Sequence, residues 1–90
     1  NMRIFELCRG DRRRIVGLPA DAGRRRYYES IGLFRDATVE VIFAARYGLA
    51  VRTAGVRLAL SRDAALEVEV SSHDAAFAVR QSQFGQEHAV

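Results

Sequence analysis

Hydrophobic and polar residues alternate with a period of two over much of the second half of the chain. Such an alternation buries one side of a segment and leaves the other side polar, and it is typical of β-strands. Turns at Tyr47-Gly48 and Ala54-Gly55 separate these runs, which predicts antiparallel hairpins. The runs are residues 38–43, 49–53, 56–60 and 66–70.

Two further short segments precede these runs, at residues 3–7 and 12–18. The second must end at Pro19, because proline cannot donate a hydrogen bond to a neighbouring strand. After residue 60, Ser61 is placed to cap a single helical turn. Strands spaced roughly every ten residues predict a small antiparallel barrel, and closure of the barrel would remove exposed sheet edges.

One longer helix is predicted between the segments at 12–18 and 38–43. Asp21 is placed to cap its start, and Gly32 is placed to end it, since glycine adopts the left-handed conformation without a steric penalty. The apolar stripe of this helix consists of Tyr27, Tyr28 and Ile31. We expect Tyr27 and Tyr28 to be buried against the sheet, together with Phe43 of the third segment.

Residues 71–90 lose this regularity. Phe77 and Phe84 fall on one face of a helical pattern that glutamine and glycine residues then interrupt. We interpret the segment as a tail in which a short helix frays. The alternative is a docking segment that packs Phe77 and Phe84 on a neighbouring chain and so makes a homo-oligomer.

Length and composition limit the choice of function. The 90 residues are 49% hydrophobic and 28% charged, which is typical of one small globular domain. No apolar run approaches the roughly 20 residues that span a bilayer, and the single Cys8 cannot form an internal disulfide. We therefore expect a cytoplasmic protein, whose natural chain would start at Met2 after a cloning remnant, Asn1.

All 14 basic residues are arginine, and the net charge is +3. The absence of lysine excludes a phosphate-binding loop of the Gly-Lys-Ser/Thr type and Schiff-base chemistry. The modest positive charge favours acidic partners.

Two arginine triplets, at 12–14 and 24–26, are candidates for anion binding, with a solvated surface as the alternative. On a strand Arg13 must point away from its two neighbours, and on a helix the three side chains diverge. We expect the stem of Arg13 to cover the barrel mouth and its guanidinium to stay in solvent. Tyr47 beside Arg46 is either an interface anchor or a cap on the barrel. The candidate partner-binding residues are Arg24, Arg25, Arg46 and Tyr47.

Neither a metal site nor a catalytic centre is predicted. His73 and His88 lie far apart, without the spacing of a metal motif, so each could at most be an occasional ligand. Glu67 and Glu69 share the expected outer face of the last strand, where carboxylates are normally solvated. We therefore expect no enzymatic activity and no cofactor.

Five motifs occur in an order that resembles the FeoA domain family, and the resemblance covers about residues 3–70. The motifs are Leu7-x-x-Gly10-Asp11, Ile15-Val16-Gly17-Leu18, residues 24–33 ending in Ile31-Gly32-Leu33, Thr38-Val39-Glu40-Val41, and residues 55–65 beginning with Gly55-Val56-Arg57-Leu58-Ala59-Leu60. The chain departs from the family pattern at Asp36, where glycine is usual, and at Ser61, where arginine is common. Tyr27 and Tyr28 also replace the usual leucines, and the usual proline is missing after Ala45.

The resemblance implies a mostly β fold, namely a small SH3-like antiparallel barrel with one inserted short α-helix. The barrel would span residues 2–70, and the tail would span 71–90. The resemblance also implies a cytosolic accessory protein of bacterial ferrous iron uptake that binds and modulates the FeoB transporter, including its GTP-binding domain.

Two alternatives remain open at this point. One is an SH3-like barrel that binds nucleic acid, and the other is the regulatory barrel of a metal-dependent repressor. We expect no nucleic-acid partner, because such barrels bind through stacked aromatic rings and basic grooves, whereas Tyr27, Tyr28 and Phe43 are expected to be buried and the arginines diverge.

Overall fold

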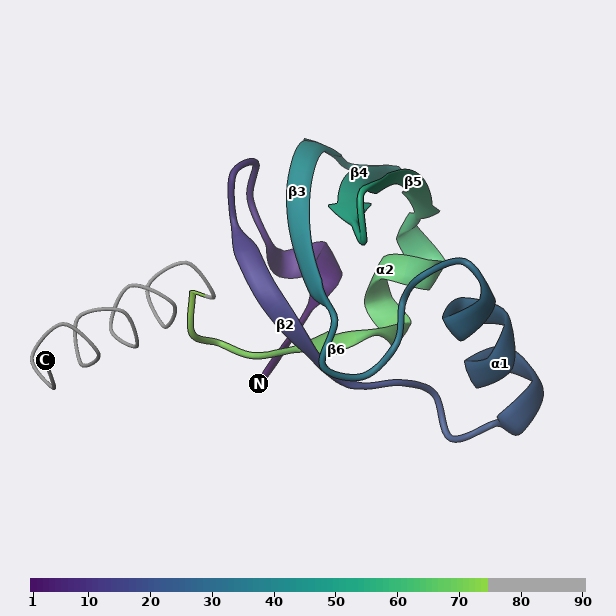
Figure 1. Cartoon of the computed structure of the whole chain (residues 1–90). Helices are drawn as coiled ribbons and strands as arrows, with labels where there is room; N and C mark the ends of the chain where they lie inside the picture. Colours follow the sequence, from purple (N-terminus) through teal and green to yellow (C-terminus); the bar gives the residue numbers. More distant parts are fainter. Residues whose placement is uncertain (75–90) are drawn as a thin grey trace, which may run out of the picture.

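The computed structural model describes residues 1–74. Its elements, in chain order, are β1 (Met2–Arg3), the 3-10 helix η1 (Ile4–Glu6), β2 (Arg12–Gly17), α1 (Ala22–Ser30), β3 (Thr38–Ala45), β4 (Gly48–Thr53), β5 (Val56–Ser61), α2 (Arg62–Glu67) and β6 (Glu69–Val70). The strands of this part of the chain form one antiparallel sheet in the order β1-β6-β2-β3-β4-β5. This confirms the mostly β, SH3-like fold with an inserted helix (Figure 1).

The strand ladder does not close on itself. Within the described sheet, β1 and β5 are the two end strands and do not pair with each other. Instead, α2 packs against η1, β4 and β5 and covers the space between the two ends of the sheet. The expectation that closure removes the sheet edges is therefore wrong, because a short helix rather than a strand pair completes the barrel.

The two helix signals in the sequence are confirmed. The Asp21 carboxylate accepts a hydrogen bond from the backbone N–H of Arg24 at 2.9 Å. At the other end, Gly32 has a φ of 105°, and the N–H of Leu33 donates to the carbonyl of Tyr28 at 2.9 Å. This is the Schellman arrangement, which satisfies carbonyl groups left free at a helix end.

Only part of the expected apolar stripe of α1 is buried. Tyr28 is 5% exposed, whereas Tyr27 is 62% exposed, so the expectation for Tyr27 is wrong. Figure 1 shows the reason: α1 lies beside the end of the barrel rather than across a sheet face. Successive side chains on a helix point about 100° apart. A helix that contacts the rest of the domain along a narrow line therefore buries only one of two adjacent tyrosines.

A β-bulge in β3 changes the side on which Phe43 lies. Val41 pairs with Val51 of β4, but Phe43 then pairs with Ala50, so the register shifts between these pairs. An extra residue in one strand moves the following side chains to the opposite face. Phe43 is therefore 53% exposed, and the expectation that it is buried is wrong.

The segment after β5 also differs from the prediction. Ser61 does cap a helix, since its hydroxyl accepts from the N–H of Ala64 at 3.2 Å. However, α2 continues to Glu67, so the expected strand at 66–70 is reduced to Glu69–Val70. Glu67 thus lies at a helix end and not on the solvated face of a strand. The turn between β3 and β4 lies one residue earlier than expected, at Arg46 and Tyr47.

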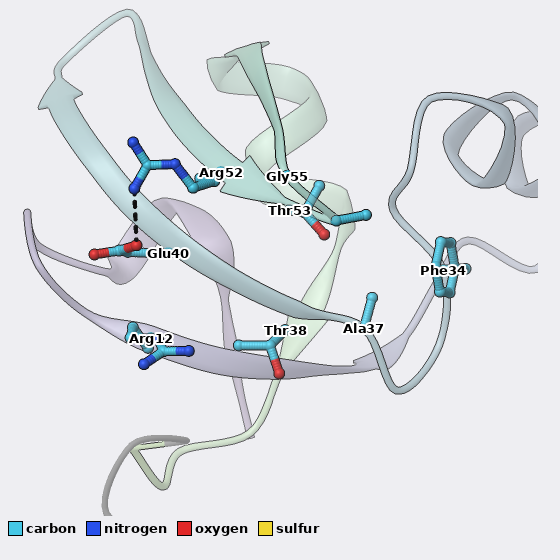
Figure 2. A pocket seen from close by; sticks show the side chains of 9 residues that line it. Arg12, Phe34, Ala37, Thr38, Glu40, Arg52, Thr53 and Gly55 are labelled. Carbon is cyan, nitrogen blue, oxygen red and sulfur yellow. Dashed lines mark hydrogen bonds and ion pairs between the residues drawn. The ribbon is translucent and has the colours of Figure 1, made fainter.

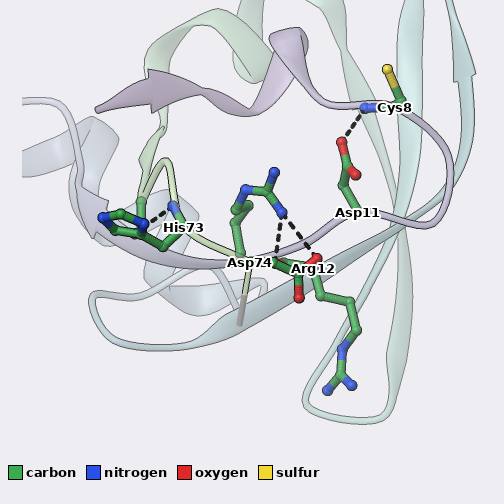
Figure 3. Close-up of polar contacts among 7 residues, drawn as sticks. Cys8, Asp11, Arg12, His73 and Asp74 are labelled. Atoms are coloured by element: carbon green, nitrogen blue, oxygen red, sulfur yellow. Dashed lines mark hydrogen bonds and ion pairs between the residues drawn. The ribbon is translucent and has the colours of Figure 1, made fainter. Parts of the chain in front are cut away.

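Arg13 occupies a less solvated position than expected. Its side chain is only 14% exposed, and its Nη1 lies 3.4 Å from Oδ2 of Asp74 and 3.1 Å from the carbonyl oxygen of Arg12 (Figure 3). Its Nε is buried and has no hydrogen-bond partner within residues 1–74. Arg13 therefore contacts the segment that follows β6, and its guanidinium is not free in solvent.

Aliphatic side chains from strands β2 to β6, from η1 and from the connecting segments form the core. The most buried of these are Ile4, Ile15, Leu33, Val39, Val41, Val51, Val68 and Val70. Phe77, Phe84 and His88 lie outside the described residues, so the tail and its possible role in oligomerisation stay predictions.

Candidate protein-binding surface

One half of the outer face of the sheet carries a row of charged residues, which we name the charged row. Arg12, Glu40, Arg52 and Arg57 are consecutive cross-strand partners on β2, β3, β4 and β5. Oε1 of Glu40 lies 3.3 Å from Nη1 of Arg52 (Figure 2). The charged row thus contains three arginines and one glutamate, and two of the arginines, Arg52 and Arg57, face each other directly across neighbouring strands. This end of the face is therefore positively charged.

The other half of the same face carries a shallow apolar groove. Two exposed aromatic residues border it, Phe43 at 53% and Tyr47 at 75% exposure. Small residues form its floor, and the directly paired Ala50 and Ala59 lie at its centre. We name this feature the apolar groove, and its lining residues are Phe43, Tyr47, Gly48, Leu49, Ala50, Ala59, Leu60 and Ser61.

The floor of the groove depends on close contact between β4 and β5. A Cβ atom at Gly48 would lie 2.3 Å from the carbonyl oxygen of Leu60, which is a backbone atom. Only glycine therefore fits at this position without moving one of the two strands. Because position 48 carries no side chain, the floor of the groove is low there, and the rings of Phe43 and Tyr47 stand above it.

The four residues predicted to bind a partner do not form one patch. Arg46 and Tyr47 are neighbours in the turn between β3 and β4, and Tyr47 borders the apolar groove. Arg24 lies in a neighbouring hollow beside Leu60 and forms an ion pair with Glu67. Arg25 donates to the carbonyl of Ala20 at 3.5 Å, and the hollow that it lines shares no residue with the groove.

Sequence reasoning missed most of this surface, including Phe43, Arg52 and Arg57. Phe43 was missed because a bulge depends on how two strands pair, and no local residue pattern marks it. Arg52 and Arg57 could have been found, since a two-residue turn at Ala54-Gly55 makes them cross-strand partners. The signal in the sequence was that this hairpin places two positively charged side chains opposite each other.

The possible metal ligands among the described residues do not gather at one place. Within residues 1–74, no three or more His, Cys, Asp or Glu side chains are grouped as metal ligands. The N–H of Cys8 donates to Oδ2 of Asp11 at 2.7 Å, and the N–H of His73 donates to Oγ of Ser71 at 3.1 Å (Figure 3). In this same part of the chain, no helix combines the length and apolar character needed to span a membrane.

Comparison with known proteins places this fold in a family. The FeoA domain family matches residues 2–72. The crystal structure of an iron uptake regulatory protein, FeoA, is 27% identical over 77% of this chain and 93% of the other, with a TM-score of 0.72. The solution structure of an FeoA protein from Chlorobium tepidum is 30% identical over 82% of this chain and 70% of the other, with a TM-score of 0.69.

A more distant likeness shows the fold alone. A manganese-dependent transcriptional repressor in complex with manganese is 24% identical over 79% of this chain but only 36% of the repressor, with a TM-score of 0.72. The comparison with curated proteins found no match. The family match over most of the sequence, together with the two FeoA structures, shows that this chain belongs to the FeoA family.

Proposed function

We propose that this FeoA-family domain is a non-enzymatic, cytoplasmic accessory protein of bacterial ferrous iron uptake. In this proposal it binds the cytosolic part of an FeoB-type transporter and modulates its activity. Membership of the FeoA family supports the process, and the apolar groove supports a function through contact with another protein.

The apolar groove is the observation that carries this proposal. Phe43 and Tyr47 present large apolar rings to solvent on one face of a small domain. Exposed aromatic residues that gather on one surface are typical of protein-binding sites, where they supply most of the binding free energy. Because paired strands form the floor, the surface is already in place before a partner binds.

A specific observation also supports a second function, nucleic-acid binding. Tyr27, Phe43 and Tyr47 are all exposed, and the charged row lies on the same face as the last two. Small barrels bind single strands with this combination of aromatic rings and arginines. For the other alternative, the regulatory barrel of a metal-dependent repressor, the shared fold is the only support.

Calorimetric titration of the full chain into the purified cytosolic part of the transporter tests the proposed function. We expect saturable binding with a Kd above about 1 μM, because a surface this small supports only a weak interface. The titration is repeated with GDP and with a non-hydrolysable GTP analogue, and GTP turnover is measured with and without the domain. Absence of binding in every nucleotide state would exclude this function.

A parallel titration with labelled single-stranded RNA separates the two functions. Binding of RNA that falls steeply as salt increases would favour the nucleic-acid alternative, because phosphate contacts release counterions.

A further inference from the structure

We propose that the apolar groove binds an extended segment of the partner protein that has apolar residues in its middle and acidic residues on both sides. This inference rests on the proposed function, because the partner is taken to be the cytosolic part of the transporter. It adds the chemical character of the segment that is recognised and the residues that recognise it.

The shape of the groove fits an extended segment. The floor lies on β4 and β5 and ends at the Ala50–Ala59 pair. The floor together with its charged flank extends from the Gly48–Ser61 pair to the Arg52–Arg57 pair, which lies two residues beyond the floor. Each strand residue advances the chain by about 3.3 Å, so these two pairs are roughly 13 Å apart. An extended chain of about four residues covers this distance. The middle of the bound segment would lie over Ala50 and Ala59. Apolar side chains are favoured there, because a polar side chain would lose its hydrogen bonds to water without gaining others.

The charges at the two ends of the groove determine the flanks of the segment. Arg46 lies at one end beside Tyr47, and Arg52 and Arg57 lie at the other. Arg46 and Arg57 take part in no ion pair within residues 1–74, and Arg52 has one, with Glu40. Arginine binds a carboxylate through two parallel hydrogen bonds. Acidic residues on both sides of an apolar middle would therefore match the groove.

The chain itself does not offer such a segment. Residues 75–90 contain one acidic residue, Glu87, and one basic residue, Arg80. Two runs have the right order of charges. Asp63-Ala64-Ala65-Leu66-Glu67 is not extended, because it forms α2 and buries Ala65, and Glu67-Val68-Glu69 has Val68 fully buried in the core. Charge complementarity thus favours a different protein over the tail or a second copy of this chain.

The test uses isotope-labelled full chain and the unlabelled cytosolic part of the transporter. We expect the largest amide shifts in the NMR spectrum at Gly48, Ala50 and Ala59. Ala59→Glu places a carboxylate on the exposed floor, and we expect it to weaken binding at least about tenfold. Arg57→Glu reverses one flanking charge, and we expect a similar loss with a smaller salt dependence.

Arg35→Glu is the matched control, because it makes the same charge change at an exposed residue whose hollow shares no residue with the groove, and it should leave the Kd unchanged. Unchanged melting temperatures of Ala59→Glu and Arg57→Glu would show that the loss is not due to unfolding.

The possible outcomes are distinguishable. If the wild type binds but the shifts lie elsewhere, or Ala59→Glu binds as tightly as the wild type, this inference fails and the proposed function stands. If nothing binds in any nucleotide state, both fail. Single-stranded RNA that shifts the same amides would overturn the inference in favour of nucleic acid. If the domain self-associates and Ala59→Glu abolishes this self-association, the inference fails and the groove binds a second copy of this chain instead.

Discussion

The phenol of Tyr28 donates a hydrogen bond to the carboxylate of Glu67 and so ties α1 to the end of α2. The same carboxylate accepts from the guanidinium of Arg24, one turn earlier on α1. Tyr28 is the buried residue of α1. This helix therefore depends on a polar contact as well as on its apolar packing.

We expect Tyr28→Phe to lower the free energy of unfolding by about 1.5 kcal/mol, because it removes one hydrogen bond to a charged group and keeps the ring. Urea denaturation followed by circular dichroism measures the change. Tyr27→Phe is the control, since the exposed Tyr27 has no comparable partner within residues 1–74. Equal stability of Tyr28→Phe and the wild type would show that the contact contributes nothing.

We expect Gly48→Ala to destabilise the domain by about 2 kcal/mol or more, because its Cβ would meet the backbone carbonyl of Leu60. Thermal unfolding of the variant measures this effect. Gly23→Ala makes the same chemical change in α1, where the Cβ would meet only the Asp21 carboxylate at 3.4 Å. It should be neutral or stabilising. A Gly48→Ala protein as stable as the wild type would mean that β4 and β5 can separate without cost.

We expect Ala54→Asn to raise the free energy of unfolding by about 0.5–1 kcal/mol. Ala54 has a φ of 50° and Gly55 a φ of 76°, so the β4–β5 turn is of type I′. Asparagine tolerates this left-handed conformation better than alanine does. A lower melting temperature in the variant would contradict this description of the turn.

We expect Tyr47→Ala to weaken binding of the transporter's cytosolic part without a change in melting temperature. The side chain is 75% exposed in a turn, so its removal costs the isolated domain little. Arg46→Ala should have a smaller effect of the same sign, because it removes one flanking charge. Both Kd values are measured by calorimetry. A large loss of stability in Tyr47→Ala would show that the ring caps the barrel instead.

Local signals in the sequence predicted the parts of the fold that depend on neighbouring residues. Asp21 and Gly32 determine the ends of α1 through contacts within the helix, and Ser61 does the same for the start of α2. The alternation along β4 and β5 was likewise sufficient to place those strands.

Features that depend on distant residues could not be predicted in this way. The bulge that exposes Phe43 results from the pairing of β3 with β4. The extension of α2 to Glu67 accompanies contacts with Tyr28 and Arg24, which lie far away in the sequence. In the candidate surface, the turn identified Tyr47 and Arg46, but the groove became visible only when Phe43 and the two alanines were placed on the same face.

Titration of the transporter's cytosolic part with the wild type and with Ala59→Glu, side by side, is the most direct test of binding through the apolar groove. We predict saturable binding of the wild type at a one-to-one ratio and at least about a tenfold higher Kd for the variant. Equal Kd values for two equally stable proteins would contradict it.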